Sequence, residues 1–150
     1  MKVPFFRLKL GAAEKRAVSD VIKSGWVTTG PRVREFEQKV CRLTGAKYAV
    51  AVSSGTAGLF LALKALSIGK GDEVITTAFT MVATVEVILH CGAKPVLADV
   101  NPVTLNIDIN SIKEKITNKT KAIIAVDIAG WPCDYRSLKK LAKEIGRAHV

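Results

Sequence analysis

The stretch Ala49-Val-Ala-Val-Ser-Ser-Gly-Thr-Ala-Gly58 decides the fold class, because an apolar run passes directly into small polar residues and then into a helix. The run from Tyr48 to Val52 is wholly apolar, which is typical of a strand buried on both faces of a parallel sheet. A helix beginning at Thr56 directs unpaired N–H groups and the positive end of its dipole toward the strand end. Small residues and hydroxyls there are typical of a phosphate-binding turn. Simple capping of the helix by Ser54 or Thr56 predicts the same sequence, so both interpretations stay open.

Helices and strands alternate along the rest of the chain. Upstream of this stretch, the hydrophobic spacing predicts helices over 11–24 and 31–44. Downstream, it predicts helices over 56–66, 81–90, 110–117 and 134–143, and strands over 73–77, 94–98 and 122–126. Strands separated by helices form a parallel sheet with right-handed crossovers. The predicted fold class is therefore α/β, a mostly parallel sheet with flanking helices.

Composition excludes several classes of protein. The 150 residues are 49% hydrophobic and 24% charged, which supports a core and argues against disorder. Cys41, Cys91 and Cys133 are too far apart to form a C-x-x-C pair, so we predict no metal site and no disulfide scaffold. The longest uncharged stretches, 48–63 and 74–85, fall short of the roughly 18 to 20 apolar residues that cross a bilayer. We expect a cytoplasmic protein with no membrane partner.

The net charge of +10 raises the question of a nucleic-acid partner. The basic residues are scattered as singles and pairs, and the densest runs, 113–121 and 139–140, are interleaved with Ile or Leu. No alternation of basic and aromatic residues of the kind that stacks bases is present. We therefore predict no nucleic-acid partner: solvated helix faces explain most of the charge, and a polyphosphate-bearing substrate could explain the rest.

A series of short motifs follows in a fixed order along the chain: Ser24–Pro31, Glu35–Glu37, Ser53–Ala57, Gly71–Thr77, Gly92–Pro95, Thr104–Asp108 and Gly130–Asp134. In this order and spacing the chain resembles the DegT/DnrJ/EryC1/StrS family, whose members are pyridoxal phosphate (PLP)-dependent aminotransferases of nucleotide-linked keto sugars. The resemblance covers residues 3–143. It implies that residues 1–143 are the N-terminal, incomplete part of the large domain of a fold-type-I PLP-dependent transferase.

The resemblance also implies which residues hold the cofactor PLP. Gly55, Thr56 and Ala57 match the positions that bind its phosphate. Met81 matches the position where the family usually has an aromatic residue over the pyridine ring. Either the Met81 thioether covers the ring or Phe79 shifts to do so, and ordinary packing of Met81 on the helix face is the alternative.

Several other residues have weaker assignments. Thr28 and Thr29 lie in a Gly-bounded loop that, in relatives, is near the substrate and the partner subunit, so we assign them to the substrate. Asp127 follows a predicted strand at the edge where ligands gather in parallel sheets, and it either faces substrate or caps the next segment. Trp26 and Trp131 adjoin turns, and we expect packing anchors rather than sugar-stacking platforms.

The resemblance places the catalytic residues of the family beyond this chain. A transaminase needs a Schiff-base Lys to move protons at the α-carbon and an Asp beside the pyridinium nitrogen to keep the ring an electron sink. Neither can be assigned here, so no catalytic residue is predicted, and we expect the fragment to be inactive alone. Unpaired sheet edges and apolar helix faces also predict poor solubility.

The last residues, 144–150, differ from the rest. They follow a helix without the buried strand that each earlier helix leads into, and a common sequencing-adapter sequence encodes Glu-Ile-Gly-Arg-Ala-His-Val. We predict that they are a non-native read-through tail.

For the whole enzyme, the resemblance implies transfer of an amino group, from glutamate, to a nucleotide-linked keto sugar for polysaccharide or glycoconjugate biosynthesis. It implies a homodimer. A PLP-dependent nucleotide-sugar dehydratase of the same fold, with His in place of the catalytic Lys, is one alternative. A non-catalytic phosphate-binding α/β module is the other.

Overall fold

A computed structural model describes residue 4, residues 6–144 and residues 148–149. The chain divides into two units, Met1–Ala51 and Val52–Val150, and each is described by itself. Every helix in the described residues is too short or too polar to cross a membrane.

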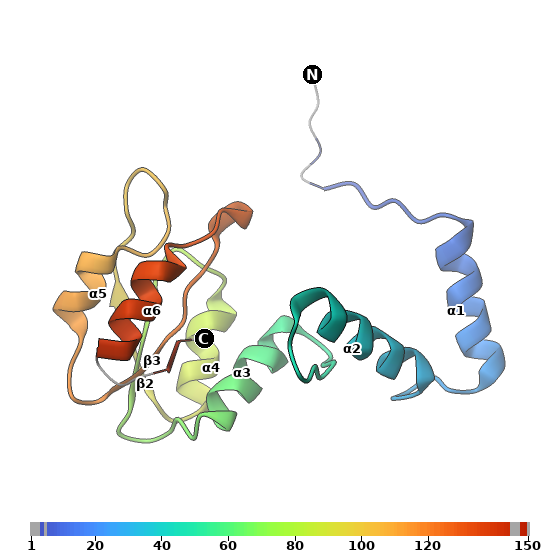
Figure 1. Ribbon diagram of the computed structural model, residues 1–150, viewed down its shortest axis with the longest axis horizontal. Helices are drawn as coiled ribbons and strands as arrows, with labels where there is room; N and C mark the ends of the chain where they lie inside the picture. The colour runs from blue at the N-terminus through green and yellow to red at the C-terminus, as the bar shows by residue number, and fades with distance from the viewer. Residues whose placement is uncertain (1–3, 5, 145–147, 150) are drawn as a thin grey trace. The chain divides into compact units, whose positions relative to one another are not determined.

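The first unit contains two helices, α1 (Ala12–Ser24) and α2 (Pro31–Thr44) (Figure 1). Both end at a glycine in the left-handed conformation: the N–H of Gly25 donates to the Ile22 carbonyl, and the N–H of Gly45 donates to the Cys41 carbonyl. Each of the two helices therefore ends in a backbone conformation that glycine favours. Neither helix buries a residue, although each carries the apolar stripe expected from the sequence.

The second unit is an α/β sheet unit. Its elements are, in chain order, α3 (Gly55–Ala65), β1 (Glu73–Thr77), α4 (Val82–His90), β2 (Lys94–Ala98), α5 (Ile109–Lys115), β3 (Thr120–Ile123), the 3₁₀ turn η1 (Ile128–Gly130), α6 (Tyr135–Glu144) and β4 (Ala148–His149). The strand order is β2-β1-β3-β4, and neighbouring strands are parallel. The predicted α/β class is confirmed.

Helices cover both faces of this sheet. Val74, Ala122 and Ile124 pack with side chains of α3 and α4. Their neighbours Ile75 and Ile123 point to the opposite face and pack with α5 and α6. All five residues of β1 are buried, as expected for an inner strand of a parallel sheet.

The predicted strand over 48–52 is wrong. These residues form no strand, and the side chain of Val50 is 77% exposed. A strand needs a hydrogen-bonded neighbour, and the described residues provide none for this segment. Instead, the N–H of Ala51 donates to Oε1 of Glu37 on α2 at 2.9 Å.

The other predicted elements are present, with small shifts in their bounds. The largest shift concerns the strand expected over 122–126, which the structure places at 120–123. Its pairing begins earlier because the Glu73 N–H donates to the Lys119 carbonyl at 2.8 Å, and an irregularity in the ladder follows between Glu73 and Val74. After Ile124, whose N–H donates to the Ile75 carbonyl, the chain leaves the sheet.

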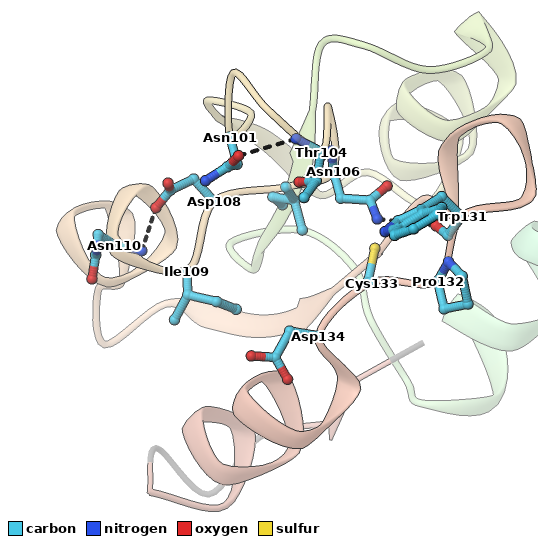
Figure 2. A pocket seen from close by; sticks show the side chains of 11 residues that line it. Asn101, Thr104, Asn106, Asp108, Ile109, Asn110, Trp131, Pro132, Cys133 and Asp134 are labelled. Carbon is cyan, nitrogen blue, oxygen red and sulfur yellow. Dashed lines mark hydrogen bonds between the residues drawn. The ribbon is translucent and has the colours of Figure 1, made fainter.

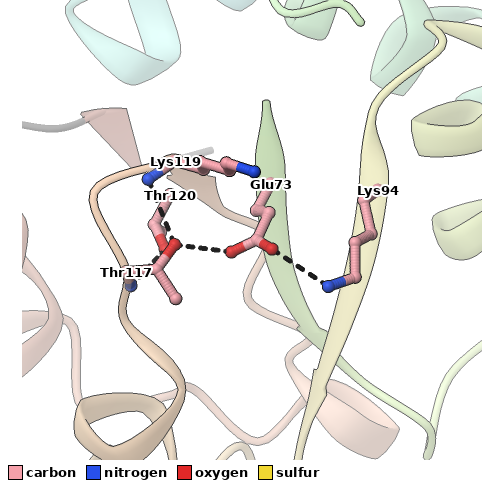
Figure 3. Close-up of polar contacts among 5 residues, drawn as sticks. All are labelled: Glu73, Lys94, Thr117, Lys119 and Thr120. Atoms are coloured by element: carbon pink, nitrogen blue, oxygen red, sulfur yellow. Dashed lines mark hydrogen bonds and ion pairs between the residues drawn. The ribbon is translucent and has the colours of Figure 1, made fainter. Parts of the chain in front are cut away.

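At the amino edge of the sheet, the buried Glu73 carboxylate ties three segments together (Figure 3). It accepts from the Thr117 hydroxyl at 2.7 Å and from Lys94 Nζ at 3.0 Å. These two hydrogen bonds, with nearby Lys119, hold the pKa of Glu73 below its ordinary value. This edge is thereby closed by side chains that bond to one another.

The short strand β4 falls within the tail that the sequence analysis sets apart. Ala148 and His149 pair with Ala122 and Ile123. Residues 145–147 and 150 lie outside the described residues. The non-native origin of 144–150 stays a prediction.

Candidate cofactor and substrate site

The start of α3 combines a cap with unused donors. Ser54 is the N-cap residue, and its Oγ accepts from the Ala57 N–H at 3.1 Å while its carbonyl accepts from the Gly58 N–H. No hydrogen-bond partner for the N–H groups of Gly55 and Thr56 is found among the described residues. The capping interpretation is therefore confirmed for Ser54. Capping uses only part of the donors at this helix end, and phosphate binding by the others stays a prediction.

The turn that carries these donors is open to solvent. A Cβ added to Gly55 would meet no atom within 4 Å, and the segment 53–56 is exposed. Two N–H groups, the Thr56 hydroxyl and the positive end of an 11-residue helix thus face open space. Ala57 lies in the same turn, but its N–H is already occupied by Ser54.

Met81 and Phe79 have different surroundings. Met81 is the N-cap residue of α4, which packs against α3, and its side chain is 75% exposed. Phe79 is 48% exposed and lines an apolar hollow with Leu105 and Trp131. Phe79 thus lines a hollow with residues of two loops, whereas Met81 is largely exposed. Which of the two side chains covers a ring stays a prediction.

Two adjoining hollows lie beyond the carboxyl ends of the parallel strands. One is the apolar hollow containing Phe79, bounded by 103–105 and 128–131. The other is polar, bounded by 101–110 and 131–134 (Figure 2). Thr104 and Trp131 line both. Since 79, 101–110 and 127–134 follow β1, β2 and β3, the hollows occupy the edge where α/β sheets bind ligands.

Asp127 caps the segment that follows it. Its Oδ1 accepts from the Cys133 N–H at 2.9 Å and from the Tyr135 hydroxyl at 3.0 Å. The Cys133 N–H is the main reason that the pKa of Asp127 lies below its ordinary value. Burial and the Asp127 carboxylate raise the pKa of Cys133 to about 11 and that of Tyr135 to about 12. Of the two roles left open by the sequence, these contacts match the second: Asp127 makes no side-chain cap bond to the turn η1, but it holds the segment after that turn.

Asn106, which precedes α5, bonds to the backbone of the same segment that Asp127 holds. Its Nδ2 donates to the Trp131 carbonyl at 3.0 Å, and its Oδ1 accepts from the Ile128 N–H at 3.1 Å. Asn106 is buried. Between these contacts Ala129 takes the left-handed conformation, with φ 50° and ψ 24°, which is strained for a residue other than glycine.

The two tryptophans differ from the expectation of packing anchors in different ways. Trp26 packs closely on Gly30, where an added Cβ would lie 3.1 Å from the Trp26 Cβ. Trp131 is held through its backbone, yet its side chain is 65% exposed. Trp26 is itself 58% exposed, so neither tryptophan is buried as a packing anchor would be.

The predicted site residues are divided between the two units. Gly55, Thr56, Ala57 and Met81 lie at the amino ends of two helices of the second unit that pack together. Thr28 and Thr29 are exposed residues of the first unit, and their assignment to substrate stays a prediction. Within the described residues, no group of three His, Cys, Asp or Glu side chains is placed to hold a metal.

Sequence reasoning missed Asn106 and the Asp127–Tyr135 pair. The sequence contains a signal for Asn106, which stands between the apolar residues Leu105 and Ile107. If this segment is buried, the amide side chain must form hydrogen bonds within the protein. Nothing comparable points to Tyr135.

A model of the DegT/DnrJ/EryC1/StrS aminotransferase family matches residues 9–148. The chain belongs to this family. It is 40% identical to the aminotransferase from Psychrobacter cryohalolentis, with a TM-score of 0.91 over 97% of this chain and 38% of that one. Spr1654 from Streptococcus pneumoniae, in its PLP form, is 40% identical to this chain, with a TM-score of 0.91 over 96% of this chain and 37% of that one. NtdA from Bacillus subtilis, with bound cofactor PMP (pyridoxamine phosphate), is 32% identical to this chain, with a TM-score of 0.87 over 90% of this chain and 31% of that one.

The family and its cofactor are thereby established, and so is the fold: that of the PLP-dependent aminotransferases. This chain spans between 31% and 38% of the length of these three solved chains.

Proposed function

We propose that this chain is the N-terminal part of the large domain of an enzyme that transfers an amino group, from glutamate, to a nucleotide-linked keto sugar for polysaccharide or glycoconjugate biosynthesis. The observation that carries the proposal is the open helix end at Gly55 and Thr56 in a chain of the aminotransferase family. The same proposal includes a Schiff-base Lys and a ring-nitrogen Asp that lie beyond this chain. It also includes a cytoplasmic homodimer, and it holds that residues 1–143 are inactive alone.

The residues present have defined tasks in it. The N–H groups of Gly55 and Thr56 and the Thr56 hydroxyl bind the cofactor phosphate, and Ala57 keeps the turn in place by donating to Ser54. The Met81 side chain covers one face of the ring, a contact worth about 0.3–1.5 kcal/mol. PLP, when bound, supplies an electron sink for proton removal beside the amino group. Thr28 and Thr29 contact the substrate.

Binding of pyridoxamine phosphate to this chain tests the proposal, because that form of the cofactor needs no Schiff-base Lys. We expect saturable shifts of the Gly55 and Thr56 amide resonances in a ¹H–¹⁵N titration, and none with pyridoxamine, which lacks the phosphate. Thr56→Val should weaken binding about twofold to tenfold by removing one hydrogen bond. Amide resonances that do not move with pyridoxamine phosphate would contradict the proposal.

A further inference from the structure

The turn 78–81, which joins β1 to α4, is bonded to a buried threonine on each side. Thr77, the last residue of β1, is 2% exposed, and its hydroxyl accepts from the Phe79 N–H at 3.1 Å. Thr84, in the first turn of α4, is 5% exposed, and its hydroxyl oxygen lies 2.9 Å from that of Thr80. Two buried side chains thus bond to a segment whose own side chains are half-buried or exposed.

The Thr84 hydroxyl is a polar group in an apolar setting. The other buried residues of α4, Val87 and Ile88, are apolar and pack in the cluster formed by the sheet with α3 and α4. A valine at residue 84 would have nearly the same shape, and burying a hydroxyl costs free energy that a hydrogen bond must offset. Packing therefore does not call for this hydroxyl, and its bond to Thr80 connects it to the turn.

Thr84 also holds the residue after Thr80. Its N–H donates to the Met81 carbonyl at 3.0 Å, so one buried residue bonds to two successive residues of the turn. Met81 has the extended backbone of an N-cap residue, with φ −67° and ψ 142°, and its side chain is 75% exposed. A fixed backbone limits the rotamers, and hence the directions, open to that side chain. α4 packs against α3, whose first residues are Gly55 and Thr56.

Phe79 is held differently by the same turn. Its N–H is bonded to Thr77, and its side chain lines the apolar hollow with Leu105 and Trp131. The turn thus places one of the two candidate side chains beside distant loops and leaves the Met81 side chain exposed at the start of α4.

We propose that Thr84 is a positioning residue for the cofactor: it holds the turn 78–81 so that the Met81 side chain, rather than Phe79, covers the ring. This inference rests on the proposed function, in which the cofactor phosphate binds at Gly55 and Thr56. Thr84 acts through the Met81 backbone and the Thr80 hydroxyl, because groups that contact a ligand keep their geometry only when the residues behind them are fixed.

The test follows the Met81 methyl resonance in the full chain, labelled with ¹³C at its methionine methyl groups and titrated with pyridoxamine phosphate. The chain has two methionines, so loss of one resonance in Met81→Leu identifies the other as that of Met1. A methyl group lying over an aromatic ring is shielded by it. We therefore expect a saturable upfield shift of the Met81 methyl resonance, and its absence at saturation would overturn the inference.

Variants of the hydroxyl pair test the positioning role. Thr84→Val removes the buried hydroxyl and keeps the shape, and Thr80→Val removes its half-buried partner. Each should reduce the Met81 shift at saturation to less than half, while the Gly55 and Thr56 amide resonances still respond to the phosphate. Thr84→Ser keeps the hydroxyl and should keep the shift. A full shift in both valine variants would contradict the positioning role.

A matched control removes another buried threonine hydroxyl. Thr120 is fully buried at the amino edge of the sheet, and its hydroxyl accepts from the Thr117 N–H at 2.9 Å. Thr120→Val therefore has a comparable structural cost and should leave the Met81 shift unchanged. Equal reductions in Thr84→Val and Thr120→Val would mean that the hydroxyl pair serves stability alone.

The same samples distinguish this inference from the proposed function. If pyridoxamine phosphate shifts the Gly55 and Thr56 amide resonances while the Met81 methyl resonance does not move, only the inference fails. If the amide resonances do not respond either, the proposed function fails and the inference fails with it.

Discussion

The two edges of the sheet use polar side chains in opposite ways. At the amino edge, Glu73 bonds inward to Thr117 and Lys94, and all three groups serve to join neighbouring segments. At the carboxyl edge, Asn106 and Asp127 also bond to backbone, yet the loop they hold leaves Trp131 facing out. Polar side chains therefore close one edge of the sheet, whereas at the other they hold a loop whose aromatic side chain is exposed.

The largest loss of stability is expected from a substitution in β1, the strand that runs between the two edges. Ile75→Ala removes a fully buried side chain of β1 and should destabilise the chain by about 2–5 kcal/mol, through lost burial and a cavity. Urea unfolding followed by circular dichroism measures this. Val103→Ala, at an exposed loop position, is the control, with an expected change within about 0.5 kcal/mol. Equal losses in the two variants would show that β1 is not the centre of the core.

A smaller effect should be confined to the carboxyl edge. Asn106→Ala leaves the Ile128 N–H and the Trp131 carbonyl without partners, at a loss of about 1–3 kcal/mol. Trp131 fluorescence in a Trp26→Phe background should change with it, because the loop is no longer fixed. An unchanged emission spectrum with full stability would mean that the amide does not hold the loop.

The Cys133 thiol reports on the Asp127 charge. Burial first, and then Asp127, raises the pKa of Cys133 to about 11, which keeps the reactive thiolate scarce near neutral pH. Asp127→Asn should therefore speed the reaction of Cys133 with a disulfide reagent severalfold at pH 8, while burial still slows it. The Cys41→Ser/Cys91→Ser background isolates this thiol. A rate that does not respond would mean that the carboxylate leaves the thiol pKa unchanged.

The smallest effect concerns the amino edge and acid. The pKa of Glu73 is lowered from 4.5, so its contribution to stability is complete above that value and is lost as the pH falls through the folded-state pKa. Glu73→Gln should remove this part of the acid sensitivity, which melting temperatures between pH 7 and pH 3 measure. Asp20→Asn, on α1, should leave the acid sensitivity unchanged. A Glu73→Gln curve parallel to that of the unmodified chain would contradict the assignment.

Helices and strands whose bounds depend on local hydrophobic periodicity could be predicted from the sequence. Strand pairing, which depends on a neighbour elsewhere in the chain, could not. The strands 73–77 and 94–98 and the helix 31–44 have the predicted bounds, because their patterns and end signals are local. The segment 48–52 reads as a buried strand, but whether it pairs depends on a neighbour that its own residues do not specify.

The candidate site shows the same division. The helix end at Gly55 and Thr56 could be predicted, because small residues before a helix present donors in any context. The surroundings of Phe79 could not, since they depend on Leu105 and Trp131, which line the same hollow from distant parts of the chain. Nor could the role of Asp127, which depends on a turn with a left-handed alanine.

The open space at Gly55 means that the fold itself does not call for glycine at the start of α3. Nothing within 4 Å of this position obstructs a side chain, and its backbone does not lie in the left-handed region, so the fold does not require glycine there. Alanine is a better helix former by roughly 0.5–1 kcal/mol in a helix interior. Stability of the helix alone therefore does not account for the glycine at residue 55.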